Sequence, residues 1–305
     1  MRKITMRNYR MLEDFQRVES LLKKEYQKKD HNGYLLPEFW EYAHTHPMFN
    51  PYKAHRMGIW EEEGELVAIA AYEMDLGDAF LFAKRGYEFL YEEMLAYAEK
   101  EISMIKDEVY ISDVWTTDQQ KDVMDLLEKR GYEKVHEEAI TIYNYDQGFD
   151  EVKLPDGFEI VSLEEENDFA KIHECLWKGF DHGDEPDDDV DCRRLMQSGP
   201  HFRKDLSMVV KAPDGSYASF AGMWLNEEQK YAYLEPLATV PKYRKLGLGK
   251  ALLMKAMEKT QTFGATYCYG GMFEYYNNLG FENAGMRRMY RKKSKEALNR
   301  KKRNL

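Results

Sequence analysis

The spacing of apolar residues predicts the same order of elements in both halves of this 305-residue chain. Apolar positions that recur every three or four residues predict amphipathic helices over 12–24 and 165–180. A glycine turn feeds a predicted strand at 64–71 in the first half and at 215–222 in the second. Near the end of each half, a helix stops at a glycine and a strand follows. We interpret this echo as two copies of one fold, with a chance similarity as the alternative.

The elements of the second half follow one another closely, with short turns between them. Such an order is typical of the α/β class, here an α+β arrangement in which a mixed, mostly antiparallel central sheet is flanked by helices. The pattern predicts strands at 206–210, 217–225, 231–240 and 265–269, and helices at 251–263 and 273–279.

A boundary between the halves is expected where turn formers and charged residues interrupt the apolar pattern, between Asp146 and Gly157. A closing strand is predicted before it at 141–145, and an opening strand after it at 158–161. The chain is long enough for each half to bury a core of its own. We therefore expect two domains, 1–147 and 148–305.

Charge is distributed unevenly along the chain, whose formal net charge is −11. Basic residues gather near the C-terminus, so the remainder is more acidic than the total suggests. An acidic body should repel nucleic acid and attract cationic small molecules. For the basic segment, a solvated strand end and helix is favoured, and contact with RNA or a membrane is the alternative. Its members are Arg287, Arg288, Arg291, Lys292, Lys293, Lys295, Arg300, Lys301, Lys302 and Arg303.

Composition gives no sign of a membrane segment, a disulfide framework or a metal site. The longest apolar run, 66–72, is far shorter than the roughly 20 residues that span a bilayer. The N-terminus lacks the apolar core of a secretory signal. The three cysteines and eight histidines show no spacing typical of disulfides or of zinc ligands. We expect a cytoplasmic protein without a bound metal.

The stretch with the clearest chemistry runs from Leu237 to Ala251, where a predicted strand enters a glycine loop that opens a helix. Gly247 and Gly249 carry no Cβ that would keep a phosphate away from the backbone. The exposed N–H groups and the positive end of the helix then favour an anion. Arg244 and Lys245 add positive charge beside it. Glycine spacing alone leaves a plain turn as the alternative.

With its flanks, this stretch resembles the GNAT superfamily of N-acetyltransferases, whose signature is Arg/Gln-x-x-Gly-x-Gly/Ala after a strand. Arg244, Gly247 and Gly249 match that signature. The later segment 275–282, Tyr-Tyr-Asn-Asn-Leu-Gly-Phe-Glu, resembles the end of a family helix that carries an aromatic residue, a tyrosine and Leu-Gly-Phe. The resemblance covers residues 155–292 well and the first half only faintly. It implies tandem GNAT-like domains, of which the first is degenerate.

The resemblance also implies roles for individual residues, with acetyl-CoA as the co-substrate. The amide of Leu237 would polarise the thioester carbonyl as an oxyanion donor, and Tyr276 would protonate the departing thiolate. A core tyrosine is the alternative for Tyr276. The main chain of Leu237, Ala238 and Thr239 would pair with the pantetheine arm, and the amides of Lys245, Leu246, Gly247, Leu248, Gly249 and Lys250 would hold the pyrophosphate.

An attacking amine must lose a proton, and Glu235 is the candidate base. Strand alternation predicts that Tyr233, Glu235 and Leu237 share one face, and apolar neighbours favour a raised pKa for Glu235. Substrate orientation or a salt bridge are its alternative roles. Two positions depart from the family pattern: Tyr269 replaces a polar asparagine that is often found there, and Pro236 interrupts the strand beside the base.

The first half lacks the glycine loop, because residues 82–87 supply one glycine in place of two. It is expected to bind no acyl-CoA and to shape the acceptor site. A dense acidic segment, 181–191, favours a cationic amine as acceptor, although a solvated acidic loop is equally expected.

The sequence therefore predicts an N-acetyltransferase that acts on a small, cationic primary amine by direct attack. A non-catalytic acyl-CoA-binding or regulatory module and a protein or peptide N-acetyltransferase are the alternatives. A homodimer is a further expectation, since exposed strand edges in such folds often pair.

Overall fold

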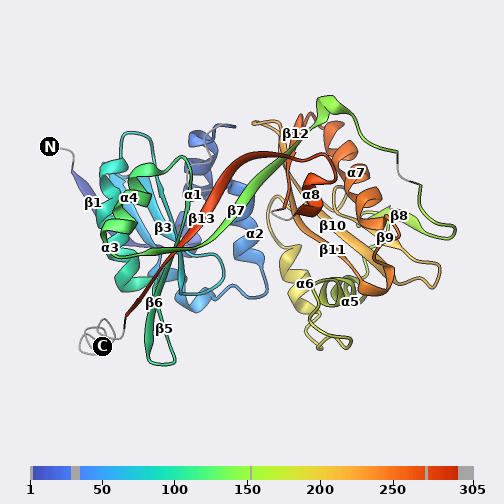
Figure 1. The fold of residues 1–305 in the computed structure, drawn as a ribbon, viewed down its shortest axis with the longest axis horizontal. Coiled ribbons are helices and arrows are strands. Elements are labelled where there is room, and N and C mark those ends of the chain that lie inside the picture. The colour runs from blue at the N-terminus through green and yellow to red at the C-terminus, as the bar shows by residue number, and fades with distance from the viewer. Residues whose placement is uncertain (1–2, 29–34, 152, 272–273, 295–305) are drawn as a thin grey trace. The chain divides into compact units, whose positions relative to one another are not determined.

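A computed structural model describes residues 3–28, 35–151, 153–271 and 274–294. The chain forms two compact units that do not follow the order of the sequence. The first unit comprises Met1–His44, Met48–Ala139 and the stretch that begins at Ala284. The second unit comprises Thr45–Pro47 and Ile140–Asn283. Each unit contains a sheet flanked by helices (Figure 1).

The sheet of the first unit has the strand order β1-β2-β3-β4-β6-β13. Its neighbours are antiparallel, apart from the parallel pair β4–β6. The helix predicted at 12–24 is confirmed and buries Val18, Leu21 and Leu22. The elements of this unit are β1 (Ile4–Asn8), α1 (Met11–Glu25), α2 (Pro37–Thr45), η2 (Pro51–Arg56), β2 (Gly58–Glu62), β3 (Glu65–Ala71), β4 (Asp78–Ala83), η3 (Glu88–Leu90), α3 (Tyr91–Glu101), β5 (Met104–Lys106), β6 (Val109–Thr117), α4 (Lys121–Lys129) and β13 (Glu282–Ser294).

The sheet of the second unit has the order β12-β11-β10-β9-β8, and the end of β7 pairs with β12. The pair β11–β12 is parallel and the others are antiparallel. The predicted mixed, mostly antiparallel sheets flanked by helices are thus confirmed. The elements are β7 (Glu133–Asn144), η4 (Tyr145–Gln147), β8 (Glu159–Ser162), α5 (Phe169–Gly179), α6 (Asp191–Met196), β9 (Met208–Lys211), β10 (Tyr217–Asn226), β11 (Tyr231–Thr239), η5 (Pro241–Tyr243), α7 (Leu248–Gln261), β12 (Tyr267–Tyr269) and α8 (Glu274–Asn277).

Two apolar cores hold the second unit, one on each face of its sheet. On one face α7 buries Leu252, Leu253 and Met257 against β9, β10 and β11. On the other face α5 buries Ile172 and Leu176 among residues of the same strands. Because both faces are covered, β10 is buried at nearly every position, and the ends of β11 are fixed from both sides.

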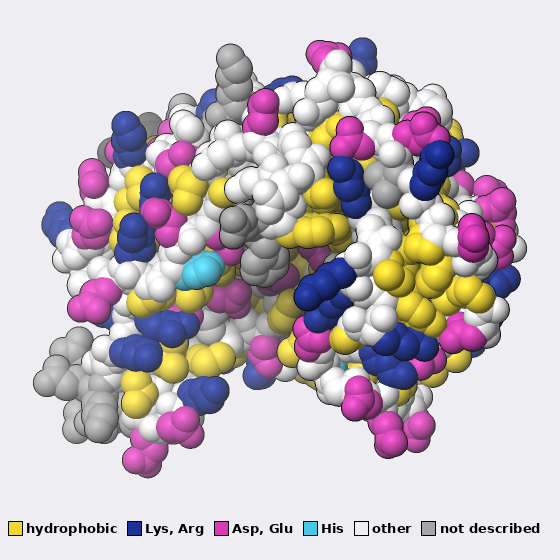
Figure 2. All heavy atoms as spheres, turned by 45° about the vertical axis from the view of Figure 1, so that its right-hand side comes forward, with side chains coloured by type: hydrophobic (Ala, Val, Ile, Leu, Met, Phe, Trp, Pro, Cys, Tyr) yellow, Lys and Arg dark blue, Asp and Glu magenta, His cyan; other side chains and the backbone are white. Residues whose placement is uncertain are grey.

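Strand β13 extends the sheet of the first unit, although its residues follow the second unit in the sequence. It pairs with β6 from Arg287–Thr117 to Ser294–Tyr110. Four cations of the predicted basic segment form ion pairs here. Lys and Arg side chains intermingle with Asp and Glu over the visible face of the protein (Figure 2). Lys293 also belongs to this strand, and the cations from Lys295 on lie outside the described residues. The pairs are Arg287–Glu138, Arg288–Glu137, Arg291–Asp113 and Lys292–Glu99.

Among the described helices, none combines the length and the apolar composition that crossing a membrane would require.

Candidate active site

The predicted glycine loop borders a cavity of about 800 Å³ in the second unit. The cavity lies between the end of β11, the start of α7 and α8. All the predicted site residues line it except Leu246, which is exposed, and Glu235. Three residues that sequence reasoning missed also line it: Gly179, Tyr243 and Tyr275. The structure thus brings the predicted loop, strand and tyrosine together around one space.

The cavity begins where β11 and β12 separate. The two strands pair only from Tyr231–Tyr267 to Tyr233–Tyr269, and β12 ends there. Beyond this point β11 continues to Thr239 and pairs with β10 alone among the described strands. One edge of residues 237–239 is therefore turned to the cavity instead of to a neighbouring strand.

The orientation of the main chain along this edge follows from one hydrogen bond. The N–H of Val240 donates to the carbonyl of Ala218, on the β10 side, at 3.0 Å. Successive residues of a strand turn their N–H groups to opposite edges. Alternation therefore points the N–H groups of Leu237 and Thr239 away from β10, and so toward the cavity. Two donors are available there to a ligand that lies along the strand.

The N-terminus of α7 is left without a side-chain cap. Its N-cap residue, Gly247, has φ +78°, a left-handed conformation that favours glycine, and supplies no side chain to accept from the first amides. By contrast, the N-cap of α5, Asp168, accepts hydrogen bonds from the amides of Ala170 and Lys171. The first amides of α7 are thus left without a side-chain cap beside the cavity, an arrangement that, together with the helix dipole, favours an anion.

Gly249 allows a second close approach in the loop. A Cβ at this position would lie 3.0 Å from both Thr239 Oγ1 and Tyr275 Oη. These contacts are tighter than side chains normally accept, so a residue larger than glycine would push the strand end or Tyr275 away. The second glycine of the motif therefore keeps the helix start close to the walls of the cavity.

Tyr276 lines the cavity from α8 and is largely buried, with its side chain against Phe281 at 5.2 Å between ring centroids. A Cβ on Gly271 would lie only 3.0 Å from the Tyr276 hydroxyl, so glycine there leaves room for the ring. The same ring belongs to the core under α7. Tyr276 is thus both a packing residue and a hydroxyl at the edge of the cavity.

The expectation that Tyr233, Glu235 and Leu237 share one face is wrong. Leu234 and Leu237 pack in the same core, on the α7 side, while Ala238 packs in the core on the α5 side. The cause is a bulge: two residues of β11, Glu235 and Pro236, stand opposite the one residue of β10 between Ala221 and Met223. Alternation is broken at this point of the strand.

Glu235 itself is half-buried and held by its main chain. The Trp224 indole donates to the Glu235 carbonyl at 3.0 Å. A Cβ on Gly222 would lie 2.5 Å from the same carbonyl, so the bulge requires glycine opposite it. These contacts fix the backbone of Glu235 in the middle of β11, two residues before Leu237 and just past the point where the pairing with β12 ends.

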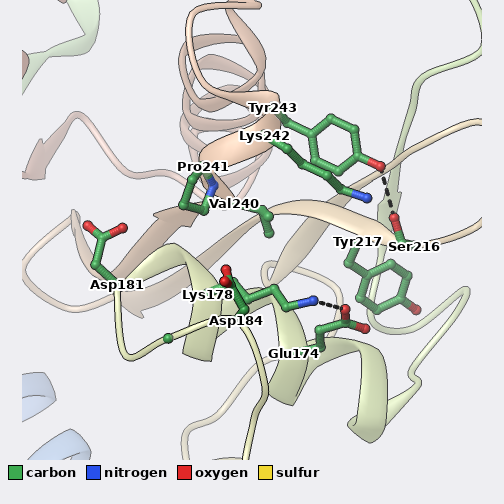
Figure 3. Close-up of a pocket in the computed structure, with 11 residues that line it drawn as sticks. Glu174, Lys178, Asp181, Asp184, Ser216, Tyr217, Val240, Pro241, Lys242 and Tyr243 are labelled. Atoms are coloured by element: carbon green, nitrogen blue, oxygen red, sulfur yellow. Dashed lines mark hydrogen bonds and ion pairs between the residues drawn. The ribbon is translucent and has the colours of Figure 1, made fainter.

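The acidic segment lies beside the turn that follows β11, whereas Glu235 lies in the middle of that strand. Asp181 and Asp184 border a smaller cavity, of about 290 Å³, together with Lys178, Lys242 and Tyr217 (Figure 3). Other members of the segment contact the neighbouring helices: Asp187 lies 3.1 Å from His173 of α5, and Asp189 accepts from the amide of Cys192 in α6.

The three cysteines, Cys175, Cys192 and Cys268, are all buried as free thiols. Burial raises the pKa of each thiol above its usual value. The Cys192 sulfur lies 3.6 Å from His173 Nδ1, but Cys192 does not line the described cavities. The thiols therefore stay protonated and inaccessible, which is unsuitable for a nucleophile.

The first unit shows a different arrangement at the corresponding strands. Strands β4 and β6 pair only from Asp78–Asp113 to Phe80–Trp115. Beyond that, the buried Gln120 side chain donates to the Leu81 carbonyl and accepts from the Thr117 amide, at 3.2 Å each. The Gln120 side chain thus bridges the two separating strands.

Comparisons with known proteins agree with this geometry. A family model described as the acetyltransferase (GNAT) family matches residues 167–292. No curated protein matches the chain in sequence. Similar solved structures include a GCN5-related N-acetyltransferase from Sphaerobacter thermophilus, with 12% identity and a TM-score of 0.62, covering 95% of each chain.

Two further solved structures share the fold at low identity. One is a tandem GNAT protein from the clavulanic acid biosynthesis pathway, with 12% identity and a TM-score of 0.59, covering 95% of this chain and 98% of that one. The other is Saccharomyces cerevisiae N-myristoyltransferase with bound myristoyl-CoA, with 13% identity and a TM-score of 0.55, covering 95% and 79%.

Residues 167–292 thus match the acetyltransferase (GNAT) family model, and the chain shares its fold with solved GCN5-related N-acetyltransferases. The matched residues include the strand, the glycine loop and the tyrosines around the 800 Å³ cavity.

Proposed function

We propose that the protein transfers an acetyl group from acetyl-CoA to the primary amine of a small, cationic molecule by direct attack. The observation that carries the proposal is the cavity between the uncapped start of α7 and the open edge of β11. An anion site and a strand edge with free donors, joined in one space, suit a ligand with a pyrophosphate at one end and an amide-containing arm.

Each part of the coenzyme would then have its own site. The amides from Lys245 to Lys250 would hold the pyrophosphate, and residues 237–239 would pair with the pantetheine arm. The Leu237 N–H, which points toward the cavity, would donate to the thioester oxygen as negative charge develops there. Tyr276 would donate its proton to the sulfur as the carbon–sulfur bond breaks. Glu235 would accept the proton of the amine or orient it.

Direct attack is favoured over an acyl-enzyme. In a double displacement a cysteine would first take the acetyl group, and its thiolate would have to reach the thioester. Burial holds Cys175, Cys192 and Cys268 in the thiol form, and they do not line the cavity. The amine nitrogen would therefore attack the carbonyl carbon itself, and the proton it loses would pass to Glu235 while the CoA sulfur gains one from Tyr276.

A cationic acceptor is supported by the overall acidity of the chain, whose formal net charge of −11 would concentrate cations near its surface. The acidic segment gives little support, because Asp181 and Asp184 border the small cavity beside Val240–Tyr243 instead of the bulge at Glu235.

The direct test is turnover of acetyl-CoA with a panel of amines. Free CoA released from acetyl-CoA is measured with a thiol reagent in the presence of polyamines, aminosugars, aminoglycosides and short peptides. Release that depends on one class of small amine supports the proposal, and the acetylated product is identified by mass. Tight acetyl-CoA binding without turnover on any amine would instead support a non-catalytic module, and turnover on peptides alone a peptide acetyltransferase.

We further propose that the first unit is a degenerate copy that binds no coenzyme. Gln120 would occupy the space between β4 and β6 that the pantetheine arm takes in the second unit. The cavity that Gln120 lines is only about 170 Å³, too small for coenzyme A. The loop beside it contains Gly86 alone in place of the two glycines.

We expect calorimetry to show one acetyl-CoA site per chain. Gln120→Ala should leave that number at one, while the unpaired Leu81 carbonyl and Thr117 amide lower the free energy of unfolding by about 1–3 kcal/mol. Gln119→Ala, at the next position, is the matched control and should change neither quantity. Two equivalent sites per chain would contradict the degenerate copy.

A further inference from the structure

The Arg244 side chain is fastened to protein groups on one side of the coenzyme cavity. Its Nε donates to the carbonyl of Thr239 at 3.1 Å. Its Nη2 donates to the carbonyl of Gly179 at 2.9 Å and forms an ion pair with Asp181, also at 2.9 Å. Thr239 is the last residue of β11 and Gly179 the last of α5. One guanidinium thus joins the end of the coenzyme strand to the end of a helix.

This helix end rests directly on the strand. A Cβ on Gly179 would lie 2.8 Å from the Ala238 Cβ and 3.3 Å from the Thr239 nitrogen. Gly179 and Arg244 both line the 800 Å³ cavity. Any movement of the end of α5 away from β11 would therefore change the wall against which a ligand along residues 237–239 lies.

The negative charge of Asp181 would by itself weaken the binding of an anion at the neighbouring loop. Its carboxylate stands close to the loop at Arg244 and by charge alone opposes a bound pyrophosphate. Its backbone has φ +59°, a left-handed conformation that aspartate adopts more readily than most residues other than glycine. In Figure 3 its side chain points away from Lys178, and its carboxylate forms the ion pair with Arg244.

Lys245 is the contrasting cation of the loop. It is exposed, and within the described part of the chain no ion pair or side-chain hydrogen bond engages its ammonium group. It lines the same cavity, so it is available to attract phosphates through its charge. The two adjacent basic residues of the motif therefore differ: Arg244 binds protein groups, and the Lys245 ammonium group is left to interact with a ligand.

We propose that Arg244 is a positioning residue, with Asp181 as its counter-charge: together they hold the C-terminal end of α5 against β11 and so maintain the coenzyme cavity. Lys245 supplies the charge that attracts the phosphates. The proposal rests on the proposed function for its ligand, but its contacts are those of the protein alone.

The sign of one substitution distinguishes positioning from a charge effect. Asp181→Asn removes a negative charge near an anion site, so charge alone predicts tighter acetyl-CoA binding. Loss of positioning predicts the opposite, a Kd about threefold higher, as for an exposed ion pair. Asp184→Asn is the matched control, because Asp184 borders the same small cavity without an ion pair to Arg244 among the described residues; its Kd should be unchanged or lower. Asp181→Glu should restore tight binding.

Arg244→Gln should raise the Kd about tenfold, because two hydrogen bonds to main-chain carbonyls are lost with the ion pair. Adding Asp181→Asn to it should cause no further loss, since both act through one contact. The salt dependence of binding should persist in Arg244→Gln and weaken in Lys245→Gln.

Tighter binding in Asp181→Asn, equal to that in Asp184→Asn, would overturn the proposal and make Arg244 chiefly a phosphate ligand. Failure of the wild-type chain to bind acetyl-CoA would instead defeat the proposed function. In that event the positioning role is tested in the ligand-free protein by amide hydrogen exchange at residues 180–182. Faster exchange in Asp181→Asn than in Asp184→Asn supports the positioning role, and equal exchange overturns it.

Discussion

Replacement of Gly247 by aspartate should raise the Kd for acetyl-CoA at least about 100-fold relative to replacement by asparagine. Both side chains must adopt the left-handed conformation of Gly247, φ +78°, at similar cost. Only aspartate places a negative charge at the start of α7, where the pyrophosphate should bind. At about 4 Å and an effective dielectric constant near 20, like unit charges repel by about 4 kcal/mol, and exposure reduces this to about 3 kcal/mol.

The comparison of the two variants separates charge from structure. Aspartate and asparagine are both good N-cap residues, so each should cap α7 and leave the thermal unfolding temperature within a few degrees of the other. Calorimetric titration of both with acetyl-CoA gives the ratio of the two Kd values. A ratio near one would mean that the acyl-CoA does not place its phosphates at this helix, and the cavity would need another occupant.

The glycine loop could be predicted from the sequence because its signal is local. Gly247 and Gly249 stand at the start of a helix whose apolar spacing is clear, and a strand precedes them within a few residues. The backbone chemistry of such a turn depends on neighbours in the chain, so the residues themselves indicate an anion site. The tyrosine motif added Tyr276, which lines the same cavity.

Residues brought to the cavity from distant segments could not be predicted in this way. Gly179 belongs to α5, and its contact with Ala238 depends on how that helix packs on the sheet. Tyr243 reaches the cavity through the turn after β11. Tyr275 had a usable signal, since it is an aromatic residue directly before Tyr276 and within the same motif.

The bulge at Glu235–Pro236 shows why strand faces are difficult to assign from spacing alone. Alternation holds while a strand pairs regularly, and one extra residue exchanges the faces that follow. Pro236 indicated an interruption of the strand, but which side of the sheet the following residues face depends on the pairing with β10. Strand β13 is a similar case: the chain was expected to divide at 147–148, whereas β13 joins β6 in the first unit, and such long-range pairing leaves no local signal.

Tyr276→Phe should lower kcat about 100-fold, the lower range for removal of a general acid, while the Kd for acetyl-CoA stays the same. The ring keeps its contacts with Phe281 and the core, so only the hydroxyl at the cavity is lost. A thiol of ordinary pKa, about 8.5, leaves as a stable thiolate in more alkaline solution. The deficit should therefore shrink as the pH rises above that value, where the leaving sulfur needs no proton.

Tyr275→Phe is the matched control, because Tyr275 is the neighbouring residue and lines the same cavity. It should reduce kcat less than about threefold, since no proton transfer depends on its hydroxyl. Both variants are measured by CoA release with the amine that gives the fastest turnover, across neutral and alkaline pH. If Tyr276→Phe matched Tyr275→Phe at neutral pH, Tyr276 would be a packing residue and the thiolate would depart without its proton. A deficit that stayed constant with pH would point instead to a role of the hydroxyl in orienting the thioester.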